Sequence, residues 1–396
     1  MANAQSIVFL YKAAAVPDLI LERMREGTPD GFELTLCEQS TPAAQRRAAV
    51  SGADYLVVYS TTFDDLDVAK KVRLLQLLSA GYDRIDIKAL GQAGIPVADN
   101  GGANAPTVAE HALLLMLAVY RKLPMHHGAL QRGEWIGLRE GLGLRELRGK
   151  QVGIVGFGRI GRDVARMVNG FLATPVYADA MAAPAQVERD LGAKRLPLDE
   201  LLATSDVITL HTPLNASTRG LIDAQAISRM KRSTILVNTS RGPVVNEADL
   251  VAALQQGRIA GAGLDVFEVE PIAADHPLLG MNNVVVTPHT AGTTIDTWTR
   301  RLEFGFGNIQ RVANGDTPLS VVNGYDARAL VRPLTPALSP EIGGEGVLFP
   351  SSPRLRGEDR GEGAEQRTMS WTVARPLAEG QRVVLAPAGH RTAPRR

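Results

Sequence analysis

The chain has 396 residues, with 43 Lys and Arg against 42 Asp and Glu and a formal net charge of +1. A chain of this length is too long for one ordinary hydrophobic core and predicts two domains with additional segments. The balanced charge gives no electrostatic reason to expect nucleic acid or an anionic membrane as a partner, and 45% hydrophobic with 21% charged residues is typical of a soluble globular protein.

The cysteine content and the apolar segments bear on the cellular compartment. Cys37 is the single cysteine, which excludes an internal disulfide framework and suits a reducing compartment. Residues 1–18 carry no basic segment ahead of their apolar residues, so we expect no secretory leader. The longest apolar stretch, residues 108–120, contains Glu110 and His111 and is too short to span a bilayer. We therefore expect a cytoplasmic protein.

The first 100 residues alternate between short apolar runs and helical patterns. Strands are predicted at residues 6–11, 32–37, 54–60, 73–79 and 95–99, and helices at residues 18–25 and 86–92. Most of the apolar runs are continuous, as expected for a parallel sheet that is buried on both faces. The alternation predicts an α/β unit, which a long helix follows at about residues 105–122.

A second series of strands and helices begins at residue 151. Its strands are predicted at residues 151–158, 174–179, 205–212, 233–240, 259–267 and 283–288, with helices between them such as 160–170 and 247–256. Six strands with helical crossovers predict a doubly wound, dinucleotide-binding domain. Residues 294–314 then form one predicted helix, too little for a domain, which we expect to complete the first unit. The predicted domains are therefore 1–100 with 292–326, and 101–291.

Residues 327–396 differ in composition from the rest of the chain. Residues 331–396 hold eight Pro, eight Gly and ten Arg with no Lys, and they lack sustained apolar periodicity. This composition predicts disorder. Part of the segment resembles the read-through translation of a bacterial intergenic palindromic repeat, in which case it carries no chemistry and is dispensable. An Arg-rich interaction tail is the alternative.

The stretch QVGIVGFGRIGR, residues 151–162, has the spacing of a phosphate-binding turn. Gly156 would permit the tight turn, Gly158 would let the backbone approach a pyrophosphate, and Gly161 would let the following helix pack closely on the strand. The helix is expected to begin near Arg159, so its free N–H groups would face the phosphates. A glycine-rich turn without a ligand is the alternative.

An acidic residue follows the glycine motif at a suitable distance. Asp179 lies 18 residues past Gly161, at the end of the next predicted strand. A carboxylate there can accept hydrogen bonds from the adenosine ribose hydroxyls and repels a 2′-phosphate. The sequence therefore predicts NAD rather than NADP as the cofactor.

Three later strands deliver chemically active side chains to one edge of the second sheet. Arg241 lies in NTSRGPVVNE, Asp265 and Glu270 lie in GLDVFEVEP, and His289 lies in TPHTAG. Each alone has a plain structural explanation, such as a solvated surface arginine. All of them are predicted to lie at the carboxyl ends of parallel strands. Ligands bind at this edge in such sheets, so the pattern favours a functional site.

These segments resemble the D-isomer-specific 2-hydroxyacid dehydrogenase family, as do SAGYDRID (residues 79–86) and NGGANAPTVAEH (residues 100–111). The resemblance covers about residues 6–325. It implies a Rossmann-type NAD-binding domain and a flavodoxin-like substrate-binding domain, both doubly wound parallel sheets, with NAD in the cleft. It also implies a homodimer built through the cofactor domain.

The resemblance also implies roles for individual residues. Arg241 would hold the substrate carboxylate and keto oxygen, His289 would be the acid/base, and Glu270 would pair with His289. Backbone N–H groups of Ala80 and Gly81 would bind the substrate carboxylate. Beside them, Tyr82 stands where a small aliphatic residue is common and could narrow the pocket. The predicted cofactor-binding residues are Gly156, Gly158, Arg159, Ile160, Gly161, Asp179, Thr107, Thr212, Pro213, Thr239 and Asp265, of which Thr107 and Asp265 would lie near the nicotinamide.

We therefore expect an NAD-dependent D-2-hydroxyacid dehydrogenase that reduces a small 2-keto acid of the glyoxylate, hydroxypyruvate or phosphoglycerate type. Two alternatives remain open: an NADH-sensing co-repressor-like binding protein, and formate or phosphite oxidation on the same scaffold, against which Glu270 argues because formate enzymes carry an amide there. His126 and His127 with His111 lack the spacing of a metal site, and no metal is expected. Ser240 lacks the strand–turn–helix elbow of a hydrolase.

Overall fold

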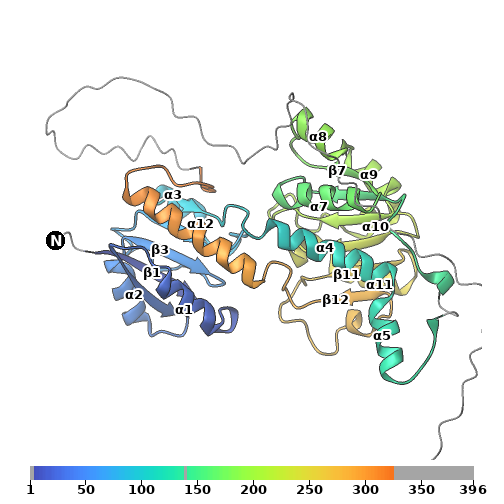
Figure 1. The fold of residues 1–396 in the computed structure, drawn as a ribbon, viewed down its shortest axis with the longest axis horizontal. Coiled ribbons are helices and arrows are strands. Elements are labelled where there is room, and N and C mark those ends of the chain that lie inside the picture. The colour runs from blue at the N-terminus through green and yellow to red at the C-terminus, as the bar shows by residue number, and fades with distance from the viewer. Residues whose placement is uncertain (1–3, 138–140, 325–396) are drawn as a thin grey trace, which may run out of the picture. The chain divides into compact units, whose positions relative to one another are not determined.

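The computed structural model describes residues 4–137 and 141–324. These residues form two parallel β-sheets flanked by helices (Figure 1). The α/β class with two doubly wound sheets is therefore confirmed. The segment predicted to be disordered, residues 327–396, lies outside the described residues.

The first sheet has the strand order β2-β1-β3-β4-β5. Its strands are β1 (Gln5–Tyr11), β2 (Phe32–Glu38), β3 (Tyr55–Tyr59), β4 (Leu74–Leu77) and β5 (Val97–Ala98). In its parallel register, Ile7 of β1 pairs with Leu34 on one side and Tyr55 on the other. This order is that of flavodoxin-like sheets, as the resemblance implied.

Helices from both ends of the described chain cover this sheet. They are α1 (Asp18–Glu26), α2 (Ala43–Gly52), α3 (Ile87–Gln92) and α12 (Ile295–Ala313). Trp298, Phe306 and Ile309 recur at helical spacing along α12 and are buried in one cluster with Ile7 and Phe9 of β1. Figure 1 shows α12, in orange, lying over the strands of this sheet. The chain therefore returns to the first sheet after completing the second.

The second sheet has the strand order β12-β11-β10-β9-β6-β7-β8. Its strands are β6 (Gln151–Val155), β7 (Thr174–Ala178), β8 (Lys194–Arg195), β9 (Val207–Leu210), β10 (Ile235–Asn238), β11 (Gly261–Leu264) and β12 (Val284–Val286). The strands β6 to β11 follow the Rossmann order, and β12 is added at the edge beside β11. The predicted count of six was wrong by one, because β8 is a two-residue exposed strand without apolar side chains.

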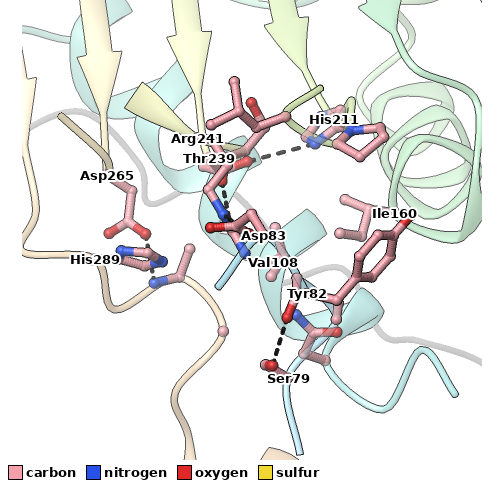
Figure 2. A pocket seen from close by; sticks show the side chains of 18 of the residues that line it. Ser79, Tyr82, Asp83, Val108, Ile160, His211, Thr239, Arg241, Asp265 and His289 are labelled. Carbon is pink, nitrogen blue, oxygen red and sulfur yellow. Dashed lines mark hydrogen bonds and ion pairs between the residues drawn. The ribbon is translucent and has the colours of Figure 1, made fainter. Parts of the chain in front are cut away.

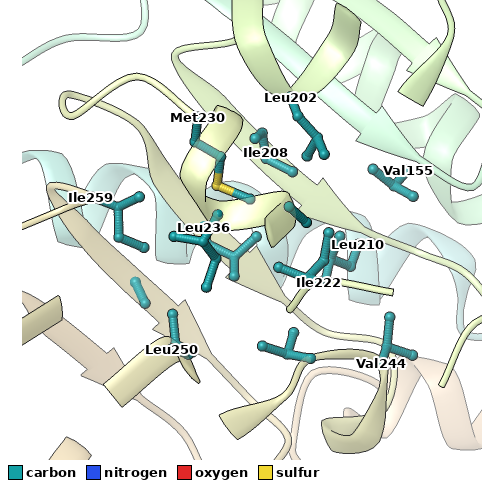
Figure 3. Close-up of a cluster of buried hydrophobic side chains, with 14 of the residues drawn as sticks. Val155, Leu202, Ile208, Leu210, Ile222, Met230, Leu236, Val244, Leu250 and Ile259 are labelled. Carbon is teal, nitrogen blue, oxygen red and sulfur yellow. The ribbon is translucent and has the colours of Figure 1, made fainter. Parts of the chain in front are cut away.

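Helices and short 3₁₀ turns precede or connect these strands, except for the 3₁₀ turn Ala13–Ala15, which follows β1 of the first sheet. The helices are α4 (Ala105–Tyr120), α5 (Leu123–Gln131), α7 (Arg159–Gly170), α8 (Ala185–Leu191), α9 (Leu198–Thr204), α10 (Ala224–Arg229) and α11 (Glu247–Gln255), and the 3₁₀ turns are Ala13–Ala15, Gly141–Gly143, Gly242–Val244 and Pro277–Gly280. One face of the sheet packs on α9, α10 and α11 through a buried aliphatic cluster that includes Leu202, Ile208, Leu236 and Leu250 (Figure 3). The other face packs on α4 and α7. Burial of both faces explains why the strands are apolar throughout.

The helix predicted at residues 105–122 corresponds to α4, and a further helix that was not predicted, α5, follows it. Lys122 adopts a left-handed backbone conformation, with φ 47°, between α4 and α5. Pro124 follows in the first turn of α5, where its missing N–H costs no hydrogen bond. Within residues 4–137 and 141–324, no helix has the length and apolar character needed to cross a membrane.

Candidate active site

A cavity of about 290 Å³ lies at the carboxyl ends of strands from both sheets. Its walls come from the loop after β4, residues 79–83, and from the loops after β9 and β10, residues 211–214 and 239–241. Asp265 and His289, after β11 and β12, complete this part of the lining (Figure 2). Parallel strands bring their carboxyl ends to one edge, so the loops that follow them meet there.

His289 and Glu270 form a hydrogen-bonded pair beside this cavity. His289 Nδ1 lies 2.8 Å from Glu270 Oε2, and a carboxylate can only accept, so Nδ1 donates. Glu270 Oε1 accepts from the Phe267 backbone N–H at 3.1 Å. Burial by itself would raise the pKa of the Glu270 carboxyl. The hydrogen bond and charge of His289 outweigh this effect, together with the Phe267 N–H and the charge of Arg241. The pKa of Glu270 is therefore lowered. The pair leaves His289 Nε2 available.

The loop that carries His289 is held by the buried carboxylate of Asp265. Its oxygens accept hydrogen bonds from Thr287 Oγ1 at 2.6 Å and from the backbone N–H groups of Thr290 and Ala291, each at 2.9 Å. The His289 backbone N–H also donates to the Asp265 carbonyl oxygen at 2.8 Å. His289 has a φ of 54°, a conformation that non-glycine residues adopt only where the surroundings enforce it. Asp265 therefore positions the histidine.

Arg241 connects the loop after β10 with the loop after β4. Its Nη1 donates to the Ser240 carbonyl oxygen at 2.7 Å, and its Nε donates to Asp83 Oδ1 at 3.0 Å. A Cβ added at Gly81 would lie 1.5 Å from Arg241 Nη2, so this edge of the guanidinium rests directly on the Gly81 backbone. The guanidinium and the loop backbone thus converge on one position, where an anion can accept from both.

The glycine motif has the geometry of a phosphate-binding turn. Gly156 has a φ of 94°, and a Cβ there would meet the backbone of His211 and Thr212 at 2.7–2.9 Å. A Cβ at Gly161 would lie 2.2 Å from the Gly156 carbonyl oxygen, whereas a Cβ at Gly158 would meet nothing within 4 Å. Gly158 is also the N-cap of α7 and provides no side-chain cap for the first N–H groups. Open space over uncapped N–H groups fits an anionic cofactor group.

Asp179 lies beside this turn, at the end of β7. Its carboxylate accepts from the backbone N–H groups of Phe157 at 2.7 Å and Met181 at 2.9 Å. The Arg195 guanidinium donates to the backbone carbonyl of Asp179 at 2.8 Å rather than to its carboxylate. A negative and a positive side chain therefore lie close to each other where the sequence predicts the adenosine ribose.

The predicted residues fall into two groups with respect to the cavity. Those that line it are Ala80, Gly81, Tyr82, Ile160, Thr212, Pro213, Thr239, Arg241, Asp265 and His289. Those that lie outside its lining are Thr107, Gly156, Gly158, Arg159, Gly161, Asp179 and Glu270. Thr212 Oγ1 is buried in the lining without a hydrogen-bond partner, as expected for a ligand-binding group. The Thr107 hydroxyl is bonded instead to Thr297 and Arg300 of α12.

The lining also contains residues to which the sequence assigned no role, among them Tyr59, Asp83, His211 and Arg301. The His211 ring lies 2.9 Å from the Thr209 hydroxyl, and burial lowers the pKa of His211 to about 3. His211 therefore stays neutral at physiological pH. Its position directly after β9 was the available signal. Asp83 and Arg301 give no local signal, because their roles depend on contacts with distant residues.

Two other polar candidates, His111 and Ser240, have structural partners. His111 Nε2 lies 2.9 Å from the Thr287 hydroxyl, and the Ser240 hydroxyl donates to Asn238 Oδ1 at 2.7 Å. Across the part of the chain that the structure describes, no group of three or more His, Cys, Asp or Glu could hold a metal ion.

Comparisons with known proteins identify the family of this chain. Residues 113–291 match the family model described as "D-isomer specific 2-hydroxyacid dehydrogenase, NAD binding domain". A glyoxylate reductase of Korarchaeum cryptofilum is 38% identical over 321 residues, which cover 79% of this chain and 95% of that relative. The chain belongs to the D-isomer specific 2-hydroxyacid dehydrogenase family. It is therefore an oxidoreductase with a nicotinamide cofactor.

Two further matches show the range of the family. A D-3-phosphoglycerate dehydrogenase of Archaeoglobus fulgidus is 40% identical over 242 residues, covering 60% of this chain and 45% of that relative. A solved structure of the NADPH-dependent glyoxylate/hydroxypyruvate reductase of Sinorhizobium meliloti, in complex with NADP and malonate, superposes with a TM-score of 0.68. It is 28% identical, and the match covers 81% of this chain and 97% of that one.

Proposed function

We propose that this protein is an NAD-dependent D-2-hydroxyacid dehydrogenase that works as a 2-keto acid reductase. The observation that carries the proposal is the 2.8 Å hydrogen bond between His289 Nδ1 and Glu270 Oε2 beside the cavity that both His289 and Arg241 line. In this proposal His289 is the acid/base, Glu270 is its partner and Arg241 is the substrate anchor. Glyoxylate, hydroxypyruvate and phosphoglycerate-type acids are the candidate substrates.

The chemistry follows from the charges of these side chains. When bound, the nicotinamide cofactor supplies the hydride for reduction. Arg241 binds the substrate carboxylate and polarises the keto oxygen, and the backbone N–H groups of Ala80 and Gly81 bind the same carboxylate. His289 Nε2 donates a proton to the substrate oxygen, and Glu270 stabilises the imidazolium that precedes this transfer. In oxidation the neutral His289 accepts the proton.

Two histidines line the cavity, and their surroundings separate their roles. His211 has no carboxylate partner in the described structure, and its pKa of about 3 keeps it in the neutral form near neutral pH, so it is not an imidazolium acid there. His289 has the Glu270 carboxylate on one ring nitrogen and keeps the other nitrogen for the substrate. This contrast supports His289 as the acid/base.

The cofactor assignment draws on the glycine motif. The open space at Gly158, the uncapped start of α7 and the unpartnered Thr212 hydroxyl support NAD binding by the predicted residues. The Asp179 carboxylate supports NAD over NADP, since it would repel a 2′-phosphate. The proposed domains remain residues 1–100 with 292–326 for substrate and 101–291 for NAD. The return of α12 to the first sheet supports this division.

A keto acid panel tests the proposal directly. We expect NADH oxidation with at least one of glyoxylate, hydroxypyruvate, pyruvate, phenylpyruvate and phosphohydroxypyruvate. His289→Gln should lower kcat by on the order of 10²–10⁴-fold, the usual contribution of a positioned acid/base. Tight NADH binding without turnover of any of them would contradict the proposal and favour a co-repressor-like NADH sensor. Turnover of formate or phosphite alone would favour the other alternative.

A homodimer built through the cofactor domain is part of the proposal. Leu123 and Leu130 of α5 and the following Trp135 are exposed, Trp135 to 85%. Exposed apolar side chains that cluster along one segment are typical of subunit interfaces. Sedimentation velocity should give twice the monomer mass, and Trp135→Glu should shift the protein toward monomer; a monomeric unmodified protein would contradict the proposal.

A further inference from the structure

Two guanidinium groups line the cavity, and they differ in their partners. Arg241 is paired with Asp83. Arg301, from α12, is only 4% exposed; its Nη1 donates to the Tyr59 hydroxyl at 3.2 Å and its Nη2 to the Gly292 carbonyl oxygen at 2.8 Å. Arg301 Nε is buried and has no hydrogen-bond partner. Arg301 thus brings a largely buried positive charge to the cavity wall.

No carboxylate of the described residues neutralises this charge. Among residues 4–137 and 141–324, no Asp or Glu forms an ion pair with Arg301. Its guanidinium carbon lies 5.1 Å from the Tyr59 ring centre and 5.0 Å from that of Trp298. The adjacent Arg300 adds a second positive charge and donates to the Ala103 carbonyl and the Thr107 hydroxyl. Aromatic rings stabilise a cation but leave the net charge in place.

Burial of this guanidinium without a counter-charge is unfavourable. Burial lowers the pKa of the Arg301 guanidinium, and the positive charge of Arg300 lowers it further. The Tyr59 hydroxyl raises this pKa but does not offset the effect of burial. An arginine nevertheless remains protonated at neutral pH. The glycine motif, which is proposed to bind the cofactor pyrophosphate, contributes only Ile160 to this cavity. The cavity that Arg301 lines is therefore largely separate from the position proposed for the pyrophosphate.

We propose that Arg301, with the hydroxyl of Tyr59, forms an anion subsite that binds a second anionic group of the substrate, at the end opposite the C1 carboxylate. This inference rests on the proposed function, in which Arg241 and the loop at residues 79–82 hold the C1 carboxylate. The preferred substrates are then 2-keto acids with a terminal carboxylate or phosphate. A neutral terminal group leaves the Arg301 charge unpaired in the complex, which disfavours binding.

Two pairs of keto acids that differ in the charge of the terminal group test the subsite. Oxaloacetate is compared with 4-methyl-2-oxopentanoate, in which an isopropyl group replaces the carboxylate, and phosphohydroxypyruvate with hydroxypyruvate. We expect kcat/KM to favour the charged member by roughly 10- to 100-fold, the range for a hydrogen bond to a charged group. If only oxaloacetate is preferred over its neutral counterpart, the subsite binds a carboxylate. If only phosphohydroxypyruvate is preferred over hydroxypyruvate, the subsite binds a phosphate.

Variants separate this subsite from a purely structural arginine. Arg301→Met should abolish the preference, mainly by raising KM for the charged member. Arg311→Met, on the same helix but outside the cavity lining, is the matched control and should leave the ratio unchanged. If Arg301→Met does not fold, Tyr59→Phe should still lower the ratio, because it removes only the hydroxyl that orients Arg301.

The outcomes distinguish this inference from the proposed function. Turnover of keto acids without a preference for the charged members, or a preference that Arg301→Met and Tyr59→Phe leave unchanged, overturns the subsite and leaves the proposed function standing. Absence of turnover for every keto acid overturns the proposed function itself, and the subsite with it.

Discussion

Arg241 and Asp83 lie 158 residues apart in the sequence, and Arg241 Nε is 3.0 Å from Asp83 Oδ1. Burial opposes ionisation of Asp83, but the charge and hydrogen bond of Arg241 lower its pKa, so Asp83 is anionic at neutral pH. The pair holds the guanidinium by its Nε edge and leaves Nη2 over Gly81. The proposed substrate anchor is therefore oriented by the loop whose backbone is proposed to bind the same carboxylate.

Gly81→Ala should impair substrate binding without destabilising the fold. The added Cβ would lie 1.5 Å from Arg241 Nη2, the mobile end of a long side chain, so the guanidinium would move and the backbone would not. We expect KM for the keto acid to rise by on the order of 10-fold or more with Tm nearly unchanged. Gly307→Ala, where a Cβ meets nothing within 4 Å, is the control for kinetics and melting. An unchanged KM would show that Arg241 does not anchor the substrate there.

Gly158→Ala should weaken cofactor binding selectively. A Cβ at Gly158 meets no protein atom within 4 Å, so the free protein should keep its Tm, whereas the methyl group would occupy the space proposed for the pyrophosphate. Fluorescence titration with NADH should give a Kd raised by on the order of 10-fold or more. Gly170→Ala at the end of α7, also without neighbours within 4 Å, should leave the Kd unchanged. Equal affinities of both variants would refute the proposed phosphate turn.

Asp179→Ala should narrow the preference for NADH over NADPH. The substitution removes the charge that repels a 2′-phosphate and leaves Arg195, whose guanidinium lies at the Asp179 backbone carbonyl. We expect kcat/KM with NADPH to rise and that with NADH to fall. The double variant Asp179→Ala/Arg195→Ala should lose much of the gain with NADPH. Equal use of both cofactors by the unmodified enzyme would remove the basis of this assignment.

Glu270→Gln should change the pH dependence of both directions of the reaction. The variant keeps the shape of Glu270 and a hydrogen bond but removes the charge that favours the imidazolium of His289. The alkaline limit of keto acid reduction should move to lower pH, and hydroxy acid oxidation should persist to lower pH. Rate profiles against pH in both directions measure the shift. Profiles that coincide with those of the unmodified enzyme would rule out the pairing.

The same variant has a consequence for stability. The folded-state pKa of Glu270 is lowered, so its contribution to stability is present above its ordinary value of 4.5 and is lost as the pH falls through the lowered value. The difference in unfolding free energy between the unmodified protein and Glu270→Gln should therefore be larger at about pH 6 than at about pH 4. Urea denaturation at both pH values measures it; a difference that grows in acid would contradict the lowered pKa.

Asp265→Asn should destabilise the protein and reduce activity together. The buried carboxylate accepts from one hydroxyl and two backbone N–H groups, and an amide would place its own donor against one of them. The unmet hydrogen bond should cost about 1–3 kcal/mol of unfolding free energy, measurable by urea denaturation. The loop bearing His289 should lose its position, so kcat should fall. A variant with normal stability and kcat would show that the loop does not depend on this carboxylate.

Local sequence patterns were sufficient to predict much of the fold and the candidate site. Continuous apolar runs predicted parallel sheets, because strands covered by helices on both faces need apolar side chains on both. The positions of Arg241, Glu270 and His289 after consecutive strands predicted their convergence, since parallel strands end at one edge of a sheet. The glycine spacing 156, 158 and 161 predicted the turn before α7 from backbone sterics alone.

Only the tertiary structure decided the contacts that join distant segments. The pairing of Asp83 with Arg241, the burial of Arg301 against Tyr59 and Trp298, and the bonding of the Thr107 hydroxyl to α12 depend on how helices and loops pack. The edge strand β8 was missed because its two exposed residues carry no apolar pattern. A sequence pattern reports which face of an element is buried, whereas the charge and hydrogen-bond partners of a side chain follow from which faces meet.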